Sequence, residues 1–78
     1  MPTQESIDQA LARALRRLRR ENGNTQEDLA HNAGITVTSL ARIERGQTNP
    51  RWTTVRRITS ALEISLAELV VVVEDARV

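Results

Sequence analysis

The side chains that could do chemistry in this 78-residue chain are mainly arginines. Each presents a planar array of N–H donors that suits phosphate, carboxylate and guanine. Ten arginines fall within residues 13–57 against four acidic residues, which gives this part a charge of +6, while the remaining residues are acidic in balance. Such a distribution is typical of a surface that binds a polyanion.

Catalysis and metal binding have few candidate residues. The chain has no cysteine and His31 is its only histidine, so a metal site lacks partner ligands. Asp28 lies close before His31, but no nucleophile turn of the Gly-x-Ser-x-Gly type is present. We therefore expect no enzymatic activity, no bound metal and no cofactor. The lack of cysteine fits an intracellular protein.

A short helix is predicted where the sequence reads ITVTSLARIERG, residues 35–46. At about 100° per residue, the side that faces the core carries Leu40, Ile43 and Glu44. The opposite side carries Thr38, Ala41, Arg42 and Arg45. An unpaired carboxylate at the margin of a core is costly, so Glu44 needs a partner. Arg19, on the inner edge of the first helix, is the candidate; the alternative is a surface Glu44 beside Arg45.

The outward side of this helix has the chemistry of base recognition. Arg42 can donate two N–H groups to guanine O6 and N7, and Thr38 can bond several base edges or touch a thymine methyl. Ala41 is small enough for close approach, and Val37, at the helix tip, can meet a thymine methyl. DNA-backbone contacts are expected from the start of the preceding helix and from the following loop, at Gln26, Thr48, Asn49 and Arg51.

Five short helices are predicted to position these side chains. The first helix has one apolar stripe, which consists of Ile7, Leu11, Ala14, Leu15 and Leu18. Ser6 and Gln9 have the spacing of a capping box near its start, and the helix is expected to end near Asn22-Gly23. Thr25 caps the second helix and Gly34 closes it, whereas Thr36 caps the third and Gly46 ends it. Two short helices around a tight turn make a helix-turn-helix, whose second helix enters the major groove of DNA.

The last two predicted helices complete the core. The fourth presents one apolar face of Trp52, Val55, Ile58, Ala61 and Leu62. We expect Trp52 to be buried, with a place beside a DNA strand as the alternative. Ser65 and Glu68 form a capping box before the fifth helix. The valines at 70–73 suit a strand as well as a helix. Segment 70–78 is also a candidate dimer contact. Together with the preceding residue it offers more apolar surface than a small core needs, at Leu69, Val70, Val72 and Val73.

Several of these motifs together resemble a known family. The stretch TQEDLAHNAGITVTSLARIERGQTNP is similar to the lambda-repressor-like, Xre/Cro-type helix-turn-helix domains of bacterial and phage transcriptional regulators, and SALEISLAEL resembles their last two helices. The resemblance spans about residues 7–69 and implies an all-α, five-helix bundle. It implies base-reading positions at Val37, Thr38, Ala41 and Arg42, backbone positions at Gln26 and Arg45, and an interhelical ion pair of Arg19 with Glu44. Two features depart from the pattern: Val37, where many members have a polar residue, and the final VVVVEDARV.

These features predict a DNA-binding transcriptional regulator in one domain, residues 1–78, with its core at about 7–69. We expect a cytoplasmic, nucleoid-associated repressor that binds a palindromic operator in double-stranded DNA as a homodimer, because two recognition helices can read successive major-groove faces. No apolar run approaches the length of a membrane span, and the leucines of LARALRRLRR are needed in the core rather than at a membrane surface. The alternative is an antitoxin or adaptor whose main partner is a toxin or another protein.

Overall fold

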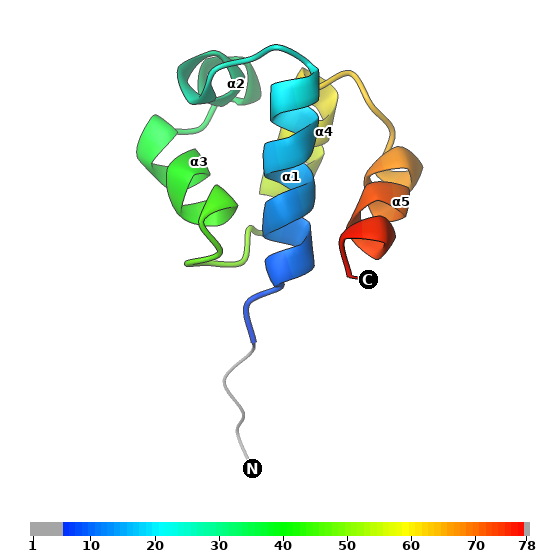
Figure 1. Cartoon of the computed structure of the whole chain (residues 1–78). Helices are drawn as coiled ribbons and strands as arrows, with labels where there is room; N and C mark the ends of the chain where they lie inside the picture. Colours follow the sequence, from blue (N-terminus) through cyan, green and yellow to red (C-terminus); the bar gives the residue numbers. More distant parts are fainter. Residues whose placement is uncertain (1–5, 78) are drawn as a thin grey trace.

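The computed structural model describes residues 6–77, and within them the chain folds into five helices and no strand. The helices are α1 (Gln9–Glu21), α2 (Gln26–Ala33), α3 (Val37–Glu44), α4 (Trp52–Ala61) and α5 (Leu66–Ala76). Figure 1 shows α1 in the centre, with α2 and α3 on one side and α5 on the other. The predicted all-α, five-helix fold is confirmed. No helix within the described residues has the length and apolar character needed to cross a membrane.

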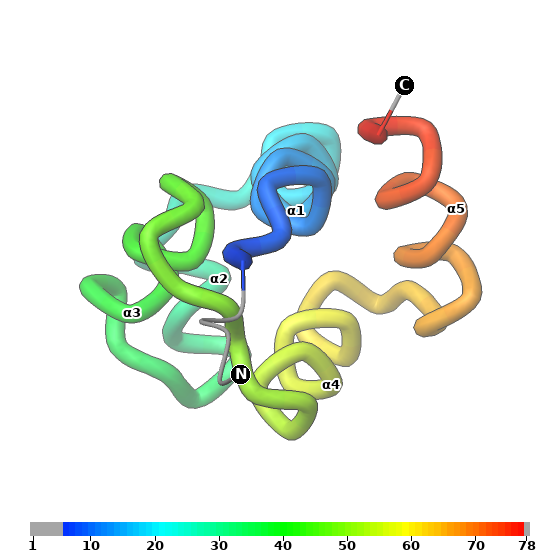
Figure 2. Tube along the Cα trace, turned by 90° about the horizontal axis from the view of Figure 1, so that it is seen from below, coloured from blue at the N-terminus to red at the C-terminus, as the bar shows by residue number. Residues whose placement is uncertain are grey.

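The core lies where four helices meet around α1. Each of α1 to α4 contributes one large side chain that is fully buried: Leu15, Leu29, Leu40 and Ile58. Leu69 adds a buried side chain from α5. Figure 2, seen from below, shows the same order around the molecule, with α3 and α5 far apart on opposite sides of α1. The outward side of α3 is therefore free of other helices.

Most helix starts follow the predicted caps. Capping boxes form at Thr25 with Asp28 and at Ser65 with Glu68, and Thr36 accepts the N–H of Ser39 at the start of α3. The prediction of Ser6 and Gln9 as the cap of α1 is wrong. Asp8 is the N-cap and its carboxylate accepts the N–H of Leu11, which satisfies one free donor of the first turn.

Two predictions about apolar residues need correction. Trp52 is exposed and not part of the core, because the buried side of α4 is formed by Val55, Ile58, Thr59 and Leu62. The valine run continues α5 as a helix, since Leu69 anchors this turn to the core and Val72 and Val73 pack partly against it. The predicted apolar surface is corrected accordingly: Val70 and Val71 are exposed, Leu69 is buried, and Val72 and Val73 are half-buried. Val78, the last residue of the predicted segment, lies outside the described residues.

Candidate nucleic-acid interface

Helices α2 and α3 form the predicted helix-turn-helix. Gly34 ends α2 with a left-handed backbone (φ 71°), a conformation that glycine adopts without a side-chain clash, and its N–H bonds to the carbonyl of His31. Thr36 then begins α3, and the two helices pack together with Leu29 and Leu40 fully buried. The short turn fixes the direction in which α3 presents its outer side.

The structure brings Glu44 and Arg19 together. The carboxylate of Glu44 is buried, and Arg19 reaches it from α1 with Nε 2.7 Å from Oε2 and Nη2 2.9 Å from Oε1. The third nitrogen of Arg19, Nη1, donates to the carbonyl oxygen of Asn24 at 3.0 Å. The hydrogen bond to Glu44 raises the pKa of the Arg19 guanidinium, which burial alone would lower. A two-point contact of this kind sets the angle between α1 and α3.

Gln26 adds a third donor to the same carboxylate. Its Nε2 lies 3.1 Å from Oε1 of Glu44, although the two residues are eighteen positions apart in the chain. The start of α2 is thereby connected to the end of α3 through a side-chain bond. Helical spacing does not predict this contact, because it relates residues within one helix and Gln26 belongs to another. The Gln26 amide has a second N–H that this bond does not use.

The outer side of α3 is polar and accessible. Val37, Thr38, Arg42 and Arg45 are exposed, and Ala41 is half-buried between them. Among residues 6–77, neither Arg42 nor Arg45 has an acidic partner within ion-pair distance. Their guanidinium groups can therefore donate to an external ligand without first breaking an internal ion pair.

The loop after α3 brings the other predicted DNA-contacting residues beside this helix. Arg42, Thr48, Asn49 and Arg51 line one open hollow of about 240 Å³ between α3, the loop and the start of α4. Gln26 is not among its lining residues, so the expected contacts fall into two groups. One group surrounds this hollow, and the other is Gln26 with its link to Glu44.

Hydrogen bonds to residues 6–9, at and before the start of α1, hold this loop in place. The side-chain oxygen of Asn49 accepts the N–H of Asp8 at 2.8 Å, and its Nδ2 donates to the carbonyl of Ser6 at 3.1 Å. Gln9 donates to the carbonyl of Gly46 at 3.1 Å. Gly46 has φ 70°, and a Cβ atom at this position would collide with the side-chain amide of Gln9. The loop conformation thus depends on glycine at 46, and one donor and one acceptor of the Asn49 side chain are already used inside the molecule.

Comparisons with known proteins agree with this arrangement. A family model described as a helix-turn-helix domain matches residues 10–70. The chain is 43% identical over 54 residues to an uncharacterized HTH-type transcriptional regulator, y4dJ, of Sinorhizobium fredii, which covers 69% of this chain and 70% of the regulator. It is 36% identical over 56 residues to the antitoxin HipB of Escherichia coli, covering 72% of this chain and 64% of HipB.

A solved structure matches both the fold and the sequence. The restriction-modification controller protein C.AhdI from Aeromonas hydrophila superposes with a TM-score of 0.78 at 31% identity. The match covers 83% of this chain and 98% of the controller. The match therefore covers nearly the whole controller, and this chain shares its fold.

Proposed function

The chain belongs to the helix-turn-helix family of DNA-binding transcriptional regulators, and from this we propose that it is a repressor that binds a palindromic operator as a homodimer. The observation that carries the proposal is the division of α3 into two sides. Leu40, Ile43 and Glu44 are buried against the other helices, while the opposite side is exposed and basic. A helix held in this way can enter a major groove without loss of its packing.

We assign base reading to the exposed side of α3. Arg42 can donate two parallel hydrogen bonds to a guanine, and Thr38 can bond a neighbouring base edge. Val37 suits a thymine methyl, and Ala41 leaves room for close approach to the bases. The free guanidinium group of Arg42 supports its role as the main source of specificity.

We assign the contacts with the DNA backbone to residues on both sides of α3. The second N–H of the Gln26 amide is available for a phosphate, and the N-terminus of α2 favours negative charge there. Thr48, Asn49 and Arg51 border the hollow beside Arg42, and Arg45 is exposed at the end of α3. These contacts fix the position of α3 on the duplex but carry no sequence information.

We propose that α5 forms the dimer contact. Val70 and Val71 are adjacent large apolar residues that are 57% and 61% exposed. They belong to α5, which lies on the side of the molecule away from α3 (Figure 2). Burial of such a pair against its copy would hold two α3 helices apart, as half-sites about 34 Å from each other require. We expect Val71→Asp to give monomers at concentrations where the unmodified chain is dimeric. Sedimentation equilibrium that shows only monomer for the unmodified chain, with and without DNA, would overturn this assignment.

The experiment that tests the proposed function is selection from a random duplex library at near-physiological salt, followed by sequencing of the bound pool. We expect an enriched inverted repeat, whose spacing gives the distance between half-sites. Placing that repeat over a promoter should lower transcription in a reporter assay when the protein is present. Binding that is sensitive to salt but enriches no sequence would mean that the basic surface only holds phosphates.

The similarity to HipB favours a second candidate function, that of an antitoxin or adaptor with a protein as its main partner. In that case residues 1–78 would still act as one DNA-binding domain in the cytoplasm, on the nucleoid, but regulation would follow occupancy by the partner. A stable complex after co-expression with the product of a neighbouring gene would support this function. Full regulation of the reporter in a strain that lacks the neighbouring gene would contradict it.

A further inference from the structure

The outward side of α4 carries the chain's only aromatic residue. Trp52 is 63% exposed, although a chain of this length has few large side chains with which to fill its core. An indole in water leaves a large apolar surface unburied, and tryptophan is among the residues most enriched at the centres of protein interfaces. The position of Trp52 is therefore better suited to binding than to packing.

Two arginines share this side of the helix. At about 100° per residue the exposed residues of α4 occupy one continuous arc. We call this arc the α4 face; it consists of Trp52, Thr53, Arg56, Arg57 and Ser60. The helix contains no acidic residue, and neither Arg56 nor Arg57 is within ion-pair distance of an acidic side chain of the part that the structure describes. The α4 face is thus rich in donors and has no internal counter-charge.

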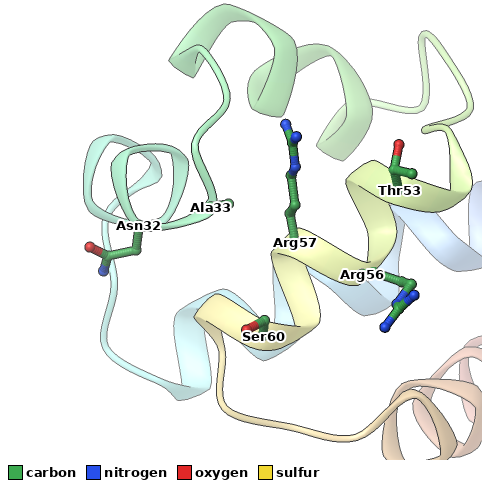
Figure 3. A pocket seen from close by; sticks show the side chains of 6 residues that line it. All are labelled: Asn32, Ala33, Thr53, Arg56, Arg57 and Ser60. Atoms are coloured by element: carbon green, nitrogen blue, oxygen red, sulfur yellow. The ribbon is translucent and has the colours of Figure 1, made fainter.

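The α4 face borders a hollow between α2 and α4. The hollow is open, has a volume of about 390 Å³, and includes Asn32 and Ala33 from the end of α2. Figure 3 shows that Arg57 extends from α4 toward α3 whereas Arg56 points away from it. The two guanidinium groups therefore do not converge on one point. They suit a ligand with several separated negative charges rather than one small anion.

We propose that the α4 face is a docking surface for an acidic segment of a protein partner. Carboxylates of such a segment would pair with Arg56 and Arg57, an apolar side chain would lie against Trp52, and a further side chain would enter the hollow beside Asn32. The exposed indole of Trp52, and Arg56, which points away from α3, favour a protein partner over a duplex. The hollow beside the α4 face shares no residue with the hollow around Arg42, but the two surfaces meet at the start of α4, where Arg51 and Trp52 are neighbours.

Trp52 itself reports whether DNA uses the surface, since its fluorescence is the only tryptophan signal of the chain. We expect acrylamide to quench Trp52 in the duplex-saturated protein as efficiently as in the free protein, to within roughly twofold. Saturation is followed independently through the anisotropy of a labelled duplex. A severalfold protection of Trp52 by the duplex would overturn the proposal and make the α4 face part of the DNA interface.

A random peptide library displayed on phage tests the partner chemistry directly on the free, full-length chain. We expect the enriched peptides to combine aspartate or glutamate with an apolar residue. The double variant Arg56→Glu, Arg57→Glu should weaken their binding at least about tenfold, and Trp52→Ala should do the same. The variant Arg56→Gln, Arg57→Gln, which removes the charges without reversing them, provides a second test if charge reversal disturbs folding.

The matched control changes the same amount of charge elsewhere. Arg16→Glu with Arg20→Glu alters α1 by the same number of charges, and should change peptide affinity by no more than about twofold. Equal loss in the control would show a response to net charge alone and would overturn the proposal. Failure to enrich any peptide whose binding depends on Arg56 and Arg57 would overturn it as well. Because these assays need no operator, their outcome is independent of whether the chain is a repressor.

Discussion

Two arginines of α1 each pair with a glutamate, and the two pairs have different surroundings. Arg17 and Glu21 lie 3.0 Å apart with side chains 55% and 57% exposed, whereas Arg19 and Glu44 lie 2.7 Å apart with side chains 11% and 2% exposed. In both pairs the hydrogen bond to the glutamate is the main cause that raises the pKa of the arginine. The direction of the pKa shift does not distinguish the pairs. They differ in burial and in the number of hydrogen bonds, which is one for Arg17 with Glu21 and two for Arg19 with Glu44.

Burial changes what happens when one partner is removed. Water surrounds Arg17 and Glu21, so either charge remains solvated if the other is lost. The carboxylate of Glu44 has little contact with water and depends on donors from α1 and α2, namely Arg19 and Gln26. Loss of the carboxylate leaves the guanidinium of Arg19 partly desolvated and unpaired. The buried pair therefore fixes the position of α3 relative to α1, whereas the exposed pair joins two side chains on the surface of α1 and contributes little to stability.

The largest expected effect is on Glu44→Ala. This substitution should lower the free energy of unfolding by about 3 to 5 kcal/mol, because it breaks a buried ion pair and leaves a cavity. Urea denaturation followed by circular dichroism measures the loss. The matched variant Glu21→Ala should leave the denaturation midpoint unchanged within error. Equal effects of the two variants would show that burial does not separate the pairs.

We expect a smaller loss of stability when the positive charge at position 19 is kept but the shape of the side chain is changed. Arg19→Lys should cost about 1 to 3 kcal/mol, since one ammonium group cannot donate to both oxygens of Glu44 and also to the carbonyl of Asn24. Arg17→Lys is the matched variant and should not change the midpoint. If Arg19→Lys were as stable as the unmodified chain, the attraction of charge alone would suffice and the two-point geometry would be unimportant.

The sequence predicted the fold well, because the information is local or periodic. Helical spacing, Gly34 as a helix end, the N-cap at Thr25 and the capping box at Ser65 are each read from a few neighbouring residues, and the structure contains them. The start of α1 was misplaced because Ser6 and Asp8 are both residue types that suit an N-cap, and helical spacing does not choose between them. Asn49, far along the chain, forms hydrogen bonds with both residues, and spacing does not predict such distant contacts.

The candidate site was predictable only in part for the same reason. The two sides of α3 and the meeting of Arg19 with Glu44 follow from helical wheels and from the resemblance to a family. The bond from Gln26 to Glu44 does not, since it joins two helices through side chains. Trp52 was expected in the core because its spacing matches Val55 and Ile58, but on the helical wheel it lies at the edge of the buried side, next to the exposed Arg56. Periodicity assigns a residue to a side of a helix and does not fix how far the buried side extends.

The comparison of identical residues in different surroundings extends to α3, where Arg42 and Arg45 are both exposed. We expect Arg42→Ala to cost about 1 to 3 kcal/mol of binding to the preferred operator and to relax the preference at one base pair. Arg45→Ala should weaken all sequences alike and reduce the slope of affinity against salt by about one unit. Equal changes in specificity would refute this division of roles. Affinity measured across single-base variants of the operator at several salt concentrations separates the two.

A third glutamate gives the smallest expected effect, with the opposite sign. Helices α1, α2 and α3 are each followed by a glycine with a left-handed backbone, at φ 75°, 71° and 70°, but after α4 the same conformation is taken by Glu63 at φ 58°. A side chain in this region costs free energy that glycine avoids. Glu63→Gly should therefore raise the free energy of unfolding by about 1 kcal/mol, measured by urea denaturation.

The control for Glu63 separates backbone strain from charge. Glu63→Ala removes the carboxylate and keeps the Cβ atom, so it should not stabilise the chain. Stabilisation by alanine equal to that by glycine would mean that the carboxylate, rather than the backbone, is unfavourable at this turn. With the expected result, three glutamates in one small protein differ for three physical reasons: burial with partners at Glu44, solvation at Glu21, and backbone strain at Glu63. The contribution of a glutamate to the free energy of unfolding then depends on its surroundings more than on its residue type.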